Sequence, residues 1–176
     1  MVKLEANLQF MFNEYELIDR YEQASKAGFK GVELQAPYSL EKDQILEKLE
    51  THNLKHVIIN LPVNDPDTDQ ANLALIPDKK DLFLERLDLG ISYASALGCI
   101  GINTGVGVKP QGFDDEEIFE TLVENQKIAS EKLAEKNIKA LIEPINTVDQ
   151  PGFFINTSKQ GMDLIEQINH HNAFLL

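Results

Sequence analysis

The chain has 176 residues, of which 43% are hydrophobic, which is enough for one domain with a substantial core. Its formal net charge of −13 disfavours binding to nucleic acid or to an anionic membrane surface, and its apolar stretches are too short and too often interrupted by charged residues for a membrane-spanning helix. A single cysteine, Cys99, excludes an internal disulfide and fits a reducing, cytoplasmic setting, and we expect its side chain to be buried.

Short apolar stretches alternate with amphipathic ones along the chain. Four amphipathic stretches have the i, i+3, i+4 spacing of helices that cover a sheet: residues 15–28, 39–53, 81–98 and 114–137. Asp114 and Glu117 form the signature of a capped helix start. The apolar stretches predict strands at residues 4–10, 30–34, 55–59, 100–103, 139–143 and 173–176. A glycine or asparagine that tolerates a left-handed helix end precedes each strand after the first: Gly28, Asn53, Gly98, Asn137 and Asn172.

Repeated strand–helix units with apolar strands predict a parallel sheet, either doubly wound or closed as a barrel. A doubly wound nucleotide-binding fold carries a glycine-rich turn after its first strand, whereas residues 9–14 contain no glycine. Polar residues recur where the strands end, as in barrels that gather their chemistry on that face: Asn7, Glu33, Asn60, Asn103 and Glu143. We therefore predict an α/β fold, a parallel (β/α) barrel of the TIM type, incomplete at about five and a half of eight units. Residues 1–176 are expected to form a single domain that is truncated before the end of the sixth strand.

Glu143 is the strongest candidate for chemistry. It ends an apolar strand and is followed by Pro144, which removes a backbone donor where the strand leaves the sheet. A carboxylate at that position is either a metal ligand or general base at the mouth of the barrel, or a solvated acid at a strand end. Glu33 allows the same two readings, with a structural role at least as well supported.

Amide and amine side chains provide further candidates. Asn103, Asn7 and Asn60 could donate hydrogen bonds to substrate oxygens or could only satisfy nearby loops. Lys109 lies in the glycine-rich loop of residues 104–112, which lacks phosphate-loop spacing. We take it as a candidate partner for a substrate carboxylate, against the alternative of a solvated lysine.

The segment "EPINTVDQPGFF", residues 143–154, resembles the fifth-strand motif of the hydroxypyruvate isomerase family, within the xylose-isomerase-like barrels. Other segments resemble the family in the same order along the chain, so the resemblance covers essentially the whole sequence. They are residues 6–14 (first strand and loop), 27–38 (second unit), 74–99 (third helix with its preceding loop) and 102–106 (fourth strand).

The resemblance implies an isomerase that interconverts hydroxypyruvate and tartronate semialdehyde, or a related oxo-acid sugar, through an enediol. A divalent metal, Mg²⁺ or Mn²⁺, holds the substrate oxygens, and two glutamates move the proton. Glu143 matches the first glutamate, which also binds the metal. The other ligands come from later strands that this sequence does not contain, so we expect weak metal binding and no useful activity from these residues alone.

One other reading stays open at this stage, and a further one is disfavoured. The chain could be a non-catalytic folded remnant of such an enzyme, and in either case exposed strand edges favour self-association. A metal-dependent endonuclease on a similar barrel would need strand-end histidines and a basic groove, and the sequence offers neither. We therefore expect a small oxo-acid or sugar as ligand, no nucleic acid and no membrane.

Overall fold

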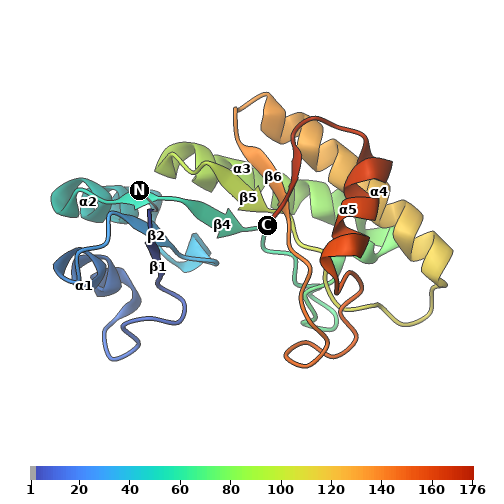
Figure 1. Ribbon diagram of the computed structural model, residues 1–176, viewed down its shortest axis with the longest axis horizontal. Coiled ribbons are helices and arrows are strands. Elements are labelled where there is room, and N and C mark those ends of the chain that lie inside the picture. Colours follow the sequence, from blue (N-terminus) through green and yellow to red (C-terminus); the bar gives the residue numbers. More distant parts are fainter. Residues whose placement is uncertain (1–2) are drawn as a thin grey trace.

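The structure is a computed structural model that describes residues 3–176, with parallel strands at the centre and helices around them (Figure 1). The strands are β1 (Glu5–Asn7), β2 (Gly31–Glu33), β3 (Lys55–His56), β4 (Ile58–Asn60), β5 (Gly101–Asn103), β6 (Lys139–Ile142) and β7 (Ala173–Leu175). The α-helices are α1 (Arg20–Lys26), α2 (Lys42–His52), α3 (Lys80–Leu97), α4 (Asp115–Ala134) and α5 (Ser158–Ile168). Short 3₁₀ turns occur at Leu17–Asp19, Pro37–Ser39, Leu73–Leu75 and Pro77–Lys79.

The strands follow one another in space in the order in which they occur in the chain. One sheet has the order β1-β2-β3, the other has the order β4-β5-β6-β7, and every pairing is parallel. The two sheets meet at Val57, whose backbone N–H donates to Val32 (2.8 Å) and whose carbonyl accepts from Ile100 (2.9 Å). The predicted third strand is therefore present but interrupted at Val57, with β3 before the interruption and β4 after it. Counted as one strand, it joins the two sheets into a row of six parallel strands.

The two faces of this strand array differ in burial. Because successive residues of a strand point to opposite faces, alternate positions form the core beneath the helices. Buried residues of that kind are Ala6, Val32, Ile59, Ile102, Ala140 and Ile142. The opposite face carries Glu33 and Asn103, and on β7 Phe174 is 38% exposed. The expectation that both faces of the strands are buried holds for β5, where Gly101, Ile102 and Asn103 are all buried, and for residues 140–142 of β6, and it fails on the opposite face of β1, β2 and β7.

The predicted helix ends are confirmed at four positions and wrong at one. Gly28, Asn53, Gly98 and Asn137 all have positive φ angles, as expected. The last helix ends earlier than predicted, with Asn169 at φ 49° as its left-handed cap. Asn172 instead donates from Nδ2 to the carbonyls of Ser130 (3.2 Å) and Ile138 (2.8 Å). Its amide thus ties the start of β7 to the neighbouring unit.

The start of α4 depends on a side-chain contact. Asp114 accepts from the N–H of Glu117 at 2.9 Å, which confirms the predicted cap of α4. The first helix is shorter than the predicted 15–28, because residues before Arg20 form a 3₁₀ turn.

Across residues 3–176, no helix is both long and apolar enough to cross a membrane.

Candidate functional site

A hollow of about 920 Å³ lies at the carboxyl ends of the strands, where β4, β5 and β6 give way to loops. Its polar lining includes Gln35, Asn60, Asn103 and Glu143. The register of the parallel pairs explains this gathering, because Asn60 lies beside Asn103 and every strand ends at the same edge. The prediction that strand-end polar residues meet on one face is confirmed for Asn60, Asn103 and Glu143.

Glu143 points into this hollow and is half-buried. Its Oε2 accepts a hydrogen bond of 2.7 Å from Nδ2 of Asn103. Burial raises the pKa of the carboxyl above its ordinary value, and the Asn103 hydrogen bond opposes that rise because it favours the ionised form. A half-buried carboxyl with a raised pKa is suited to both taking up and releasing a proton.

Asn103 has little freedom to point elsewhere. Its side chain is almost completely buried, and its Oδ1 accepts from the backbone N–H of Gly105 at 3.1 Å. With the oxygen committed to that donor, the amide nitrogen must face Glu143. The structure therefore brings Asn103 together with Glu143, and it shows the amide contacting the carboxylate.

Glu33 lies on the same face of the strand array at the end of β2. Burial, followed by the negative charges of Glu5 and Glu143, raises the pKa of Glu33 to about 7, and a hydrogen bond involving Gln35 opposes the rise. Asn7 pairs in register with Glu33, and its Oδ1 accepts from the N–H of Gln9 at 2.9 Å. Asn7 thus orders the first loop, whereas Gln9 lines the hollow.

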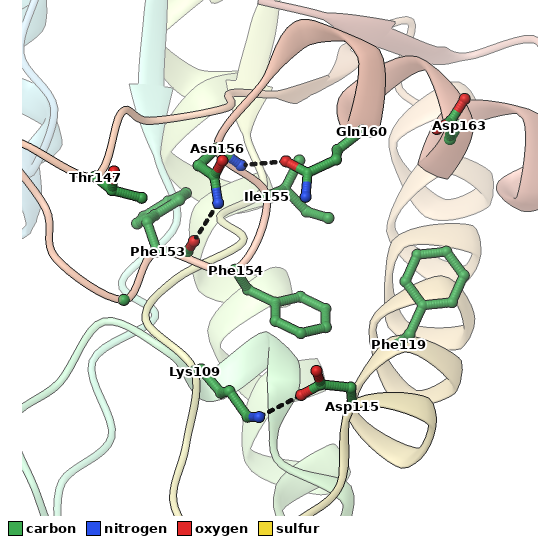
Figure 2. Close-up of a pocket in the computed structure, with 11 residues that line it drawn as sticks. Lys109, Asp115, Phe119, Thr147, Phe153, Phe154, Ile155, Asn156, Gln160 and Asp163 are labelled. Atoms are coloured by element: carbon green, nitrogen blue, oxygen red, sulfur yellow. Dashed lines mark hydrogen bonds and ion pairs between the residues drawn. The ribbon is translucent and has the colours of Figure 1, made fainter.

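Lys109 does not lie with Glu143. It lines a second hollow of about 580 Å³ between the loop after β5, the start of α4 and the segment before α5. In Figure 2 its amine points to the Asp115 carboxylate, with which it forms an ion pair. Of the three predicted substrate-binding residues, Asn103 and Lys109 therefore contribute to different hollows, and Asn7 lines neither of them.

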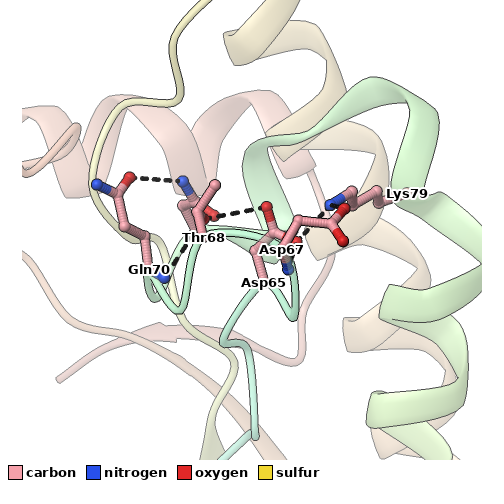
Figure 3. A network of polar contacts seen from close by, with 6 residues as sticks. Asp65, Asp67, Thr68, Gln70 and Lys79 are labelled. Carbon is pink, nitrogen blue, oxygen red and sulfur yellow. Dashed lines mark hydrogen bonds and ion pairs between the residues drawn. The ribbon is translucent and has the colours of Figure 1, made fainter.

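Sequence reasoning missed the loop of residues 61–72, which forms one wall of the first hollow through Val63, Asn64 and Ala71. A network of polar contacts holds this loop (Figure 3). Lys79 forms ion pairs with the buried Asp65 and with Asp67. The hydrogen bond from Lys79 holds the pKa of the Asp65 carboxyl below its usual value, although burial by itself would raise that pKa. In the sequence, the trace of this network is a run of acidic residues at alternate positions, Asp65, Asp67 and Asp69, followed ten residues later by Lys79.

The donor set can be compared with the needs of a divalent cation. Glu143 offers a hard carboxylate oxygen, Oε1, beside the one that accepts from Asn103. Within residues 3–176 no three His, Cys, Asp or Glu side chains are grouped to hold an ion. The chemistry of Glu143 fits one position in the coordination sphere of Mg²⁺ or Mn²⁺.

Comparison with known proteins identifies the family. The family model described as "Xylose isomerase-like TIM barrel" matches residues 21–176. The chain belongs to this family. "Hydroxypyruvate isomerase" of Escherichia coli (strain K12) is 38% identical over 96% of this chain and 65% of that protein. "2-oxo-tetronate isomerase" of Haemophilus influenzae is 33% identical over 99% of this chain and 68% of that protein. The chain thus spans about two thirds of the length of these relatives.

Solved structures agree with the assignment to the xylose isomerase-like barrels. The crystal structure of "AP endonuclease, family 2" from Brucella melitensis has a TM-score of 0.94 and 35% identity, covering 99% of this chain and 67% of that one. D-psicose 3-epimerase has a TM-score of 0.73 at 15% identity, covering 99% of this chain and 62% of that one, and shows the same fold. The predicted incomplete parallel (β/α) barrel is confirmed.

Proposed function

We propose that the hollow at the strand ends is part of the active site of an intramolecular oxidoreductase. Its substrates would be hydroxypyruvate and tartronate semialdehyde, or a related oxo-acid sugar such as a 2-oxo-tetronate. The observation that carries the proposal is the position of Glu143, a half-buried carboxyl at the end of β6 that faces the hollow and accepts from Asn103. The isomerase names of relatives at 38% and 33% identity support the reaction class.

Glu143 has the properties that the proton transfer requires. A proton on the carbon next to a carbonyl is weakly acidic, so a base must be positioned against it and must later return the proton. Asn103 donates to one carboxylate oxygen of Glu143, which lines the hollow, and leaves the other oxygen free of that hydrogen bond. A bound Mg²⁺ or Mn²⁺ would polarise the carbonyl and hydroxyl oxygens of the substrate, with Glu143 among its ligands.

The 176 residues by themselves are proposed to bind the metal weakly and to have no useful isomerase activity. Hard divalent cations take six or more oxygen ligands, and Glu143 is the one carboxylate that the described strands place at their ends against this hollow. The alternative of a non-catalytic remnant predicts a folded chain whose hollow binds neither metal nor substrate. A cytoplasmic setting belongs to the same proposal, supported by the single cysteine, Cys99, whose thiol is free.

A nuclease reading is raised by the similarity to the Brucella melitensis protein, which is named as an AP endonuclease. The net charge of −13 and the amide-rich lining of the hollow favour a small neutral or metal-bound ligand instead, because a DNA-binding surface needs lysine and arginine for the phosphates. We therefore propose no nucleic-acid partner.

Ligand binding tests the proposal. With Mg²⁺ present, hydroxypyruvate should perturb the amide NMR signals around Glu143 and Asn103 at millimolar concentration, and pyruvate should do so more weakly because it lacks the hydroxyl oxygen. Glu143→Gln should abolish the difference. Asp149→Asn is the matched control, since Asp149 also lines the hollow but pairs with Asn146. Equal responses to the two acids, or no effect of Glu143→Gln, would contradict the proposal.

A further inference from the structure

Helix α4 carries three polar side chains on the face that it turns toward the strands and loops. Asn125, Gln126 and Ser130 are at most 1% exposed, in a helix whose other buried residues on that side are mostly apolar. Burying an amide costs free energy unless its donor and acceptor atoms are hydrogen-bonded. The partners of each side chain therefore show what the burial achieves.

Gln126 directs both ends of its amide to the loop that follows β5. Its Nε2 donates to the carbonyl of Gly105 at 2.8 Å, and its Oε1 accepts from Oγ1 of Thr104 at 2.5 Å. Asn125, its neighbour on the helix, donates instead to the carbonyl of Ala74 at 3.0 Å. Gln126 is thus the residue of this group that reaches the segment directly after Asn103.

The contacts continue from Gly105 to the proposed catalytic carboxyl. The N–H of Gly105 donates to Oδ1 of Asn103, and Nδ2 of Asn103 donates to Glu143. Gly105 has φ +73°, and a Cβ there would lie 2.9 Å from a methyl group of Val63. The residue is therefore confined by its neighbours, and the hydrogen bonds on its N–H and on its C=O fix its orientation.

We propose that Gln126 is a positioning residue for Glu143 that acts through Gly105 and Asn103. The inference rests on the proposed function of the hollow and adds a buried helical residue to it. Gln126 holds the Gly105 carbonyl, Gly105 then holds the oxygen of the Asn103 amide, and the nitrogen of that amide faces the carboxylate. Removing the Gln126 amide should therefore weaken the hydrogen bonds that hold the Asn103 side chain.

The test follows the side-chain amide of Asn103 by ¹⁵N NMR in the 176-residue chain. Gln126→Met preserves the size of the side chain and removes both hydrogen bonds. Hydrogen exchange of the Asn103 Nδ2 protons should become about fivefold faster, as expected when a hydrogen bond of ordinary net strength no longer supports the loop. Their chemical shifts should also move toward those of a solvated amide.

Asn125→Leu is the matched control, because it removes one equally buried amide from the same helix turn. It should lower the stability of the fold while leaving exchange at Asn103 within about twofold of the wild type, since its lost bond of ordinary net strength lies on the loop at Ala74. If Gln126→Met does not fold, Thr104→Val is read by hydrogen exchange and not by chemical shift, because Thr104 adjoins Asn103 in the chain and its Oγ1 also contacts the carbonyl of Leu141. It removes one of the two contacts of Gln126 and should speed exchange of the Asn103 Nδ2 protons.

Unchanged hydrogen exchange at Asn103 in Gln126→Met, or in Thr104→Val where Gln126→Met does not fold, would overturn the inference, as would an equal change in Asn125→Leu. Neither metal nor substrate is needed for these measurements. If the substitutions at Gln126 and Thr104 do not affect Asn103, the proposed function can still be tested by the hydroxypyruvate experiment. If the hydroxypyruvate experiment fails instead, the role of Gln126 in orienting Asn103 still stands.

Discussion

Glu33 and Glu143 place two carboxyl groups on the inner face of the strand array, which is the face turned away from the helices, and Glu5 lies nearby. Burial is the main cause of the raised pKa of Glu33, and the charges of Glu5 and Glu143 add to it. A carboxyl whose pKa is about 7 in the folded state exchanges its proton near neutral pH. The inner face therefore has electrostatic properties that depend on pH even before any ligand is bound.

The raised pKa of Glu33 predicts how stability changes with pH. A carboxyl with a folded-state pKa above its unfolded value of about 4.3 stabilises the fold fully below that value and loses the contribution as the pH rises through the folded-state pKa. The free energy of unfolding should therefore fall between about pH 5 and pH 7.5, by about 1 kcal/mol once solvent screening is allowed for. Glu33→Gln, which stays neutral, should remove most of that fall in urea unfolding.

Glu85→Gln is the control for this experiment, because Glu85 is an exposed glutamate on α3. It should leave the pH dependence as it is in the wild type. An identical slope in Glu33→Gln and the wild type would show that the inner face does not hold Glu33 protonated.

The elements of the fold were largely predictable, because their periodicity is local. Apolar strands and amphipathic helices were assigned from spacing, and the strand-end positions of Asn103 and Glu143 followed from parallel packing. What failed depends on side-chain contacts that no helical or strand period encodes. The ion pair of Lys109 with Asp115 and the tertiary hydrogen bonds of Asn172 could not be read from spacing.

Loops after different strands interlock beside the hollow. Val108 donates from its N–H to the carbonyl of Ala71 at 3.3 Å, and Phe154 donates to the carbonyl of Gly107 at 2.9 Å. Gly107 has φ +103°, and a Cβ there would overlap the backbone of Ala71. Gly107 is therefore the point at which the loops after β4, β5 and β6 meet.

Gly107→Ala should be strongly destabilising. Positive φ and overlap with a backbone atom together should lower the free energy of unfolding by about 3 kcal/mol. Gly28→Ala is the control, because Gly28 also has positive φ but nothing lies within 4 Å of its added Cβ, so only about 1 kcal/mol should be lost. Equal losses in urea unfolding would mean that the loops do not interlock as described.

For the molecule as a whole, the strand array formed by residues 3–176 leaves β1 and β7 each paired on one side. Apolar side chains are exposed next to these edges, including Leu4 (72%), Phe174 (38%) and Leu176 (48%). Unpaired strand edges with apolar neighbours recruit other chains. We therefore expect the 176-residue chain to self-associate.

Light scattering should show a mass that rises with protein concentration. Phe174→Glu should reduce the rise, because it places a charge on the inner face of β7. Met162→Glu, at a comparably exposed position on α5, should not reduce it. A constant monomer mass over the whole concentration range would refute the expectation.

In our proposal, Glu143 is the carboxylate of the hollow that binds a divalent cation. Substoichiometric Mn²⁺ added to the ¹⁵N-labelled chain reports this directly, because the paramagnetic ion broadens the nearest amide signals even when binding is weak. We predict that the amide signals of residues 103–105 and of Glu143, Ile145 and Asn146 broaden first, that Glu143→Gln removes the effect, and that Asp149→Asn retains it. Broadening that begins at the acidic loop 65–69, or that is indifferent to Glu143→Gln, would contradict this role of Glu143.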